Sequence, residues 1–169
     1  MMKYSGFTLM EAMVVLAISA IVLAMAVPGM QEMQRRVRIS TGSDDLANLI
    51  AYAKTSSVTQ RRNIVVTRSV VGADTQVDIT YDTAAGQMLR RGTFAAPMAV
   101  TVEAPTTTLT SFVILPSGQV RRADTNVASD ITLRVCDSST LTETGRDIVI
   151  GRLGRIQATK HADATTCNP

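Results

Sequence analysis

Hydrophobic and polar positions alternate differently in successive parts of this chain. The first part is an apolar run from Phe7 to Val27, and Glu11 is the single charged residue inside it. At 1.5 Å per residue, such a run is long enough to cross a lipid bilayer as a helix, which takes about 20 residues. We therefore predict a transmembrane helix over residues 7–27.

In the second part, apolar residues recur at helical spacing. One stripe consists of Met30, Met33 and Val37, and a second consists of Leu46, Leu49, Ile50 and Ala53. Spacings of 3, 4 and 7 residues place each stripe on one face of a helix. The pattern predicts a single helix over residues 7–60, whose second half packs against a sheet.

Two positions are expected to disturb this helix. Pro28 is expected to kink or loosen it, because proline lacks a backbone N–H and clashes with the preceding turn. Ser43 followed by two aspartates is typical of a helix start, so Gly42 is expected to mark a bend or weak point. The apolar stripes themselves predict core packing rather than a ligand site.

From residue 61 to residue 169 the pattern changes to β-branched residues with a period of two. Pro116-Ser117-Gly118 predicts a hairpin turn, and the threonine-rich tract Pro105–Thr110 predicts a loop. Many short strands at this spacing indicate an antiparallel sheet or small sandwich, so the fold class is α+β. The predicted strands are 63–71, 76–81, 87–91, 98–103, 109–115, 119–122, 131–136, 147–150 and 155–159.

The six residues before the apolar run indicate processing. A secretory signal has an apolar core of 7–15 residues and a cleavage site beyond it, whereas here the core is longer and the best small-residue site, Gly6, precedes it. Cleavage between Gly6 and Phe7 would retain the helix and create an amine four residues from Glu11. A carboxylate costs about 2.5–3.5 kcal/mol at mid-membrane and less near a helix end. The new amine of one helix is therefore a suitable partner for Glu11 of a neighbouring subunit.

These residues, Gly6-Phe7-Thr8-Leu9-Met10-Glu11, match the pattern G-F-T-L-x-E. The segment resembles the class III signal of type IV pilins and type II secretion pseudopilins. The resemblance implies that a prepilin peptidase removes residues 1–6 and N-methylates Phe7, and that Glu11 promotes entry into a helical filament. Pro28 also lies where many members carry a helix-kinking proline. The alternative is an unrelated membrane-anchored periplasmic protein, for which no cleavage at Gly6 is expected.

The C-terminal half narrows this resemblance. Cys136, the segment Gly145–Ile150, Gly154-Arg155-Ile156 and Cys167 resemble the GspH/FimT/FimU group of minor pilins and minor pseudopilins. This implies a pilin-like fold, with the helix packed on a periplasmic β domain over residues 61–169. It also implies a single-pass protein of the bacterial inner membrane, in contact with its lipid, that joins other pilins or pseudopilins in a filament or tip complex. A pilus and a type II secretion system both remain open.

Cys136 and Cys167, the two cysteines, both lie far beyond the apolar run. In an oxidising periplasm they are expected to form a disulfide that holds the polar C-terminal tail. The bridge would close a loop of about 30 residues and contribute about 3–4 kcal/mol in the chain-entropy model. Two free thiols are the alternative.

Charge points to one local feature. The formal net charge of +3 is too small to indicate nucleic-acid binding from bulk charge. Basic residues cluster near the C-terminus, at Arg146, Arg152, Arg155 and Lys160, and Arg134 is a further candidate.

Some FimT-type members carry a Gly-Arg-x-Arg motif that binds DNA during natural transformation. The matching positions here are Gly154, Arg155, Ile156 and Gln157, so Gln157 replaces the second arginine. No aromatic residue is interleaved to stack on bases. DNA uptake is therefore the alternative function, beside a solvated strand face or a contact with an acidic neighbouring subunit.

Catalytic patterns are missing from the sequence. His161 is the only histidine and lies in the polar tail, and no Cys-x-x-Cys, His-Glu-x-x-His or P-loop pattern occurs. We expect no enzyme activity, no cofactor and no metal site.

A group of basic residues begins eight residues after the span, at Arg35, Arg36 and Arg38. The positive-inside rule would place such residues on the cytoplasmic side, so they oppose a simple positive-inside orientation. In pilin-type export the leader sets the orientation instead.

Overall fold

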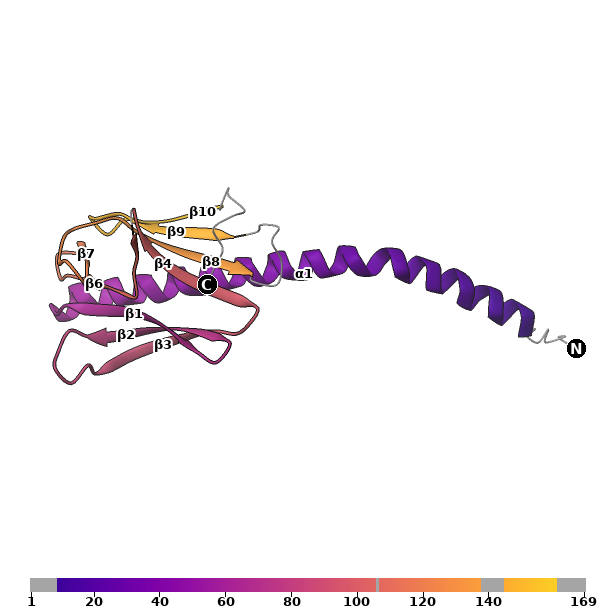
Figure 1. Ribbon diagram of the computed structural model, residues 1–169, viewed down its shortest axis with the longest axis horizontal. Helices are drawn as coiled ribbons and strands as arrows, with labels where there is room; N and C mark the ends of the chain where they lie inside the picture. The colour runs from indigo at the N-terminus through magenta and orange to yellow at the C-terminus, as the bar shows by residue number, and fades with distance from the viewer. Residues whose placement is uncertain (1–8, 106, 138–144, 161–169) are drawn as a thin grey trace, which may run out of the picture. The chain divides into compact units, whose positions relative to one another are not determined.

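The computed structural model describes residues 9–105, 107–137 and 145–160, except for the side chain of Pro28. The chain forms one helix and ten strands in the described ranges (Figure 1). It divides into two compact units, one ending at Arg36 and the other beginning at Val37. The folded unit therefore begins inside the helix and includes its second half.

Helix α1 spans Leu9–Gln60 and continues through Pro28, Gly29 and Gly42. The expected loosening at Pro28 does not interrupt the helix. Ser43 does not start a new helix, because its Oγ donates to Ser40 O at 2.9 Å within the same continuous helix. The bend at Gly42 stays a prediction. A Cβ at position 42 would lie 2.5 Å from Met98 Sδ, so this glycine lets a strand approach the helix closely.

The first sheet has the order β3-β2-β1-β6-β7 and is antiparallel throughout. Strands β1 and β2 pair along their whole length, from Ile64↔Tyr81 to Val71↔Asp74. Gly72, at a φ of 66°, lies in the two-residue turn between them. The strands are β1 Ile64–Val71, β2 Asp74–Tyr81, β3 Met88–Phe94, β6 Ser111–Ile114 and β7 Val120–Arg122.

The second sheet has the order β10-β9-β8-β4-β5 and is also antiparallel. Its short strand β5 lies in the threonine-rich tract that the sequence predicts as a loop. Thr107 and Thr108 are strand residues because they pair with Ala104 and Glu103 of β4. The strands are β4 Met98–Ala104, β5 Thr107–Thr108, β8 Ile131–Asp137, β9 Arg146–Ile150 and β10 Ile156–Lys160.

Both sheets and the second half of α1 contribute to one hydrophobic core. Leu46 and Ile50 of α1 are fully buried, as are Ile79 of the first sheet and Leu133 of the second. Burial of each such side chain contributes about 1.5–3 kcal/mol. The predicted α+β architecture, a long helix packed on an antiparallel sandwich, is confirmed.

Candidate functional site

The first candidate surface is the apolar segment of α1. Its large side chains are exposed, for example Leu9 at 79%, Leu16 at 70% and Met25 at 77%. By length and composition α1 is able to cross a membrane. Such a surface is stable only in contact with lipid or with other apolar helices.

Glu11 lies in the first turn of the described helix. A negative charge is favoured there, because the unpaired N–H groups give a helix N-terminus a partial positive charge. Gly6 and Phe7, the predicted cleavage and methylation site, lie outside the described residues. Cleavage, methylation and the role of Glu11 stay predictions.

The second candidate surface is the basic cluster, and the structure divides its residues between three places. Arg134 lies on β8 and is only 8% exposed. Its Nε and Nη2 donate to Asp147 Oδ1 and Oδ2 at 2.9 and 3.3 Å, and its Nη1 donates to Glu103 Oε1 at 3.3 Å. Arg134 therefore joins three neighbouring strands and is not displayed to a ligand.

The other four basic residues lie at opposite ends of the β9–β10 hairpin. Arg146 and Lys160 are paired in register at the open end, where Arg146 Nη1 also lies 4.0 Å from Asp44 Oδ1 of α1. Arg152 and Arg155 lie at the turn, which is closed by a bond from Gly151 N to Arg155 O at 2.9 Å. The five-residue strands β9 and β10, each about 13 Å long, run from one pair toward the other. The two pairs are thus separate sites on the hairpin.

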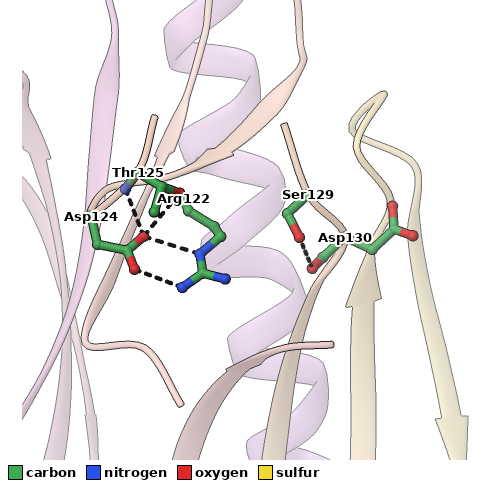
Figure 2. A network of polar contacts seen from close by, with 5 residues as sticks. All are labelled: Arg122, Asp124, Thr125, Ser129 and Asp130. Atoms are coloured by element: carbon green, nitrogen blue, oxygen red, sulfur yellow. Dashed lines mark hydrogen bonds and ion pairs between the residues drawn. The ribbon is translucent and has the colours of Figure 1, made fainter. Parts of the chain in front are cut away.

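Two carboxylates are paired with arginines, one at this turn and one at the end of β7, and Figure 2 shows Asp130 of the first pair and both residues of the second, Arg122 and Asp124. Asp130 Oδ1 accepts a hydrogen bond from Arg152 N at 2.7 Å and lies 3.9 Å from Arg152 Nε. Arg122 Nε and Nη2 donate to the two oxygens of Asp124 at 3.0 and 2.6 Å, and Thr125 N donates to Asp124 Oδ1 at 2.8 Å. The hydrogen bonds from Arg122 lower the pKa of Asp124 to about 2. The turn end therefore carries both signs of charge.

Gly154 of the Gly-Arg segment has a structural role. Its φ is 79°, and a Cβ there would lie 2.0 Å from the carbonyl oxygen of Gly118 in the β6–β7 turn. Lys54 of α1 donates to Gly154 O at 2.7 Å. The two turns and the helix therefore meet at Gly154, which needs to be glycine for both its conformation and its lack of a side chain.

Gln157, which replaces the second arginine of the DNA-binding pattern, lies on β10 beside Arg155. In the amide orientation that satisfies both groups, its oxygen accepts from Arg155 Nε and Nη2 at 3.1 and 2.9 Å. Gln157 therefore accepts hydrogen bonds from the guanidinium of Arg155 and does not supply a second positive charge.

Sequence reasoning missed the residues that pair with the basic cluster. Glu103, Asp130 and Asp147 occupy unremarkable positions in the sequence and meet arginines of the cluster only because separate segments come together. The ion pair between Arg122 and Asp124 could have been predicted from the sequence, because opposite charges two residues apart can meet within one turn.

The remaining predicted residues are placed as follows. Cys136 lies on β8 and is buried at 2% exposure. Cys167 and His161 lie outside the described residues, so the disulfide stays a prediction. Within the ranges that the structure describes, no group of three or more histidine, cysteine, aspartate or glutamate side chains could hold a metal ion.

Comparison with solved structures shows the same fold in known proteins. The type IV minor pilin FimU of Pseudomonas aeruginosa is 22% identical with a TM-score of 0.58, and the match covers 75% of this chain and 92% of that one. A second crystal form of FimU gives 20% identity and a TM-score of 0.55, with 71% of this chain and 91% of that one covered. The minor pseudopilin EpsH from the type 2 secretion system of Vibrio cholerae is 11% identical with a TM-score of 0.54, covering 73% and 97%. Comparison with curated proteins found no match.

Family models match both parts of the chain. The prokaryotic N-terminal methylation motif matches residues 1–27, which contain the predicted cleavage site and the start of α1. An N-terminal helix of this kind joined to a two-sheet domain defines a pilin-like protein. The model of type II transport protein GspH matches residues 42–154, and this chain belongs to that family.

Proposed function

We propose that the chain is a minor pilin or pseudopilin, a structural subunit that helps to initiate or cap a type IV pilus or type II secretion pseudopilus. The observation that carries the proposal is the methylation motif joined by one continuous helix to a GspH domain. Membership of a family of filament subunits supports a structural role and not an enzymatic one. Before assembly the subunit lies in the inner membrane, with its β domain in the periplasm.

Assembly on this proposal uses the first part of α1. Its exposed apolar side chains leave lipid and pack against the helices of neighbouring subunits in the filament. The amine of a neighbour's processed Phe7 neutralises Glu11, which fixes the position of each new subunit along the filament axis. Helix packing supplies the free energy of this assembly step, and the charge pair sets the position of the new subunit along the filament axis.

DNA uptake has less support from the arrangement of charge. Arg134 is buried in an ion-pair network, Asp130 faces Arg152, and Gln157 replaces an arginine. Few uncompensated contacts to phosphate mean weak and strongly salt-dependent binding. We therefore rank this alternative below the structural role.

The first test of the proposal is processing. When the chain is expressed with a prepilin peptidase, the intact mass is expected to correspond to residues 7–169 with one added methyl group. Expression without the peptidase is the control and is expected to retain Met1–Gly6. Retention of the leader in the presence of an active peptidase would contradict the proposal.

The second test concerns Glu11. Glu11→Gln keeps the size of the side chain but removes its charge, so processing is expected to continue while recovery of the subunit in sheared filaments falls at least about tenfold. That loss corresponds to about 1.4 kcal/mol, within reach of one charge pair near a helix end. Ser19→Ala, a neutral change on the same helix, is the control. Normal incorporation of the Gln variant would exclude a charge-based role.

A further inference from the structure

Residues 30–36 of α1 combine exposed apolar and basic side chains just beyond the apolar run. Met30 and Met33 are 64% and 68% exposed, and the side chain of Arg36 is 68% exposed. Basic residues are expected on the cytoplasmic side of a span, yet this segment follows the span on the side of the β domain. The proposed assembly step makes no use of these basic residues.

The position of Arg36 along the helix matches the lipid headgroup layer. It lies nine residues after Val27, which places its Cα about 13 Å beyond the apolar run at 1.5 Å per residue. Side chains on a helix lean toward its N-terminus, here toward the membrane, so an extended arginine reaches back about 6 Å. The guanidinium thus comes within about 7 Å of the hydrocarbon boundary, and the headgroup layer extends about 5–7 Å beyond that boundary.

The guanidinium of Arg36 stays exposed although it has a carboxylate partner. Glu32 Oε1 accepts from Arg36 Nε at 3.0 Å, and its Oε2 lies 3.3 Å from Nη1 of Arg35, whose side chain is only 11% exposed. The hydrogen bond from Arg36 is the largest effect lowering the pKa of Glu32, so this carboxylate stays charged at neutral pH. Arg36 and Glu32 form an exposed pair, and a pair of this kind is weak and leaves Arg36 able to bind another anion.

We propose that residues 30–36 bind anionic phospholipid headgroups of the leaflet next to the β domain. Met30 lies next to the boundary of the acyl chains while Arg36 contacts a lipid phosphate, as long basic side chains near the end of a membrane span do. The contact holds the unassembled subunit at a fixed depth until it enters a filament. This inference rests on the proposed function only in treating α1 as a membrane span.

The test uses the full-length chain in phosphatidylcholine bilayers that contain nitroxide-labelled phosphatidylglycerol or nitroxide-labelled phosphatidylcholine. Electron paramagnetic resonance gives the ratio of the association constants of the two lipids with the protein. We expect the ratio to exceed one at low salt and to fall as salt is raised. Arg36→Gln is expected to lower it by up to about fivefold, the equivalent of about 1 kcal/mol for one arginine near an anionic surface.

Two further variants separate lipid binding from damage to the fold. Glu32→Gln removes the competing carboxylate and is expected to raise the preference for phosphatidylglycerol, a change opposite to that of Arg36→Gln. Arg61→Gln removes the same charge just past the other end of α1 and is the matched control, expected to leave the ratio unchanged. A ratio of one for the unaltered chain, or equal ratios for the unaltered chain and Arg36→Gln, would overturn the inference.

The outcome is independent of the proposed function. Lipid selectivity is measured without a peptidase or partner subunits, and processing is measured without anionic lipid. A selective chain that is never cleaved would refute the filament role alone, whereas a processed chain without selectivity would refute the lipid site alone.

Discussion

At the scale of single residues, charged side chains of the β domain are mostly held by partners within the domain. Arg122 and Asp124 form a bidentate pair in the turn after β7, with Asp124 about half exposed (Figure 2). The hydrogen bonds from Arg122 are the main cause of the low pKa of Asp124, and the same pair raises the pKa of Arg122. The turn is therefore sensitive to acid.

The pair gives a pH-dependent contribution to stability. The pKa of Asp124 is about 2 in the folded chain against an ordinary value of 3.8, so the unfolded chain binds more protons between these values. The stabilisation is complete above about pH 4 and is lost as pH falls toward 2. In urea unfolding of the full chain in detergent micelles, the stability advantage of the unaltered chain over Asp124→Asn is expected to shrink over this range.

Asp45→Asn is the control for this experiment. Asp45 is exposed on α1 and has no ion pair with any residue that the structure describes, so its loss is expected to have little dependence on pH. The prediction fails if the difference between Asp124→Asn and the unaltered chain is the same at pH 6 and pH 2.5. High salt is expected to reduce the effect, because the pair is exposed.

Residue roles were predictable from the sequence only where they depend on neighbours in the chain. Arg134 was predicted as a further member of the basic cluster, but it is buried beside Asp147. That pairing follows from the register of β8 with β9, in which Arg134 lies opposite Asp147. Register is a property of the assembled sheet, so the sequence offered no signal for it.

At the scale of elements, close approaches between neighbouring segments depend on glycines. Gly42 lets β4 approach α1, and a Cβ at Gly92 of β3 would lie 2.7 Å from Leu49 Cδ2. Gly154 lets the β9–β10 turn contact the β6–β7 turn at Gly118. The packing of elements in this domain therefore relies on three positions without side chains.

Gly154→Ala is expected to destabilise the domain by about 2 kcal/mol or more. The substitution adds strain at a φ of 79° and places a Cβ against backbone, where the neighbour cannot move aside as a flexible side chain would. It also displaces the carbonyl that accepts from Lys54. The free energy of unfolding from urea titration of the full chain measures the effect.

Gly72→Ala is the matched control. Gly72 has a similar φ of 66°, but a Cβ there would meet no atom within 4 Å. This variant therefore reports the backbone strain alone, about 1 kcal/mol. Equal losses for the two variants would show that the contact between the turns adds nothing.

Most elements were predictable because their signals are local. The period of two placed nine of the strands, and the apolar run with its two stripes placed the helix. Strand β5 was predicted incorrectly as a loop, and the helix-start signal at Ser43 does not correspond to a new helix. Thr107 and Thr108 need β4 beside them to become a strand, and Gly42 serves packing against Met98 where the local sequence resembles a helix start.

At the scale of the whole molecule, the boundary between the two units lies inside α1, at Arg36 and Val37. The composition of the chain changes later, near residue 61, where the β domain was predicted to begin. One face of α1 is already buried from Ile39 onward, for example at Leu46 and Ile50. The first part of α1 therefore exposes apolar side chains, and the second part contributes to the core of the β domain.

The predicted disulfide concerns the same domain. We expect Cys136 and Cys167 to be linked in the oxidised chain, which peptide mapping without reductant would show as one joined pair of peptides. Reduction is expected to lower the free energy of unfolding by about 3–4 kcal/mol, since the loop contains about 30 residues. The double variant Cys136→Ser/Cys167→Ser is expected to match the reduced chain. Labelling of both thiols by maleimide before reduction would contradict the link.

The sequence by itself determined the apolar helix, the class of fold and the N-terminal processing signal as a prediction. These features depend on residues close together in the chain, through helical period, strand period and a six-residue pattern. Only the tertiary structure decided the order of strands, the role of Gly154 and the fate of the basic cluster. Each of these depends on which distant segments meet. The carboxylates that the fold brings to an arginine decide whether it forms a buried ion pair or stays an exposed charge.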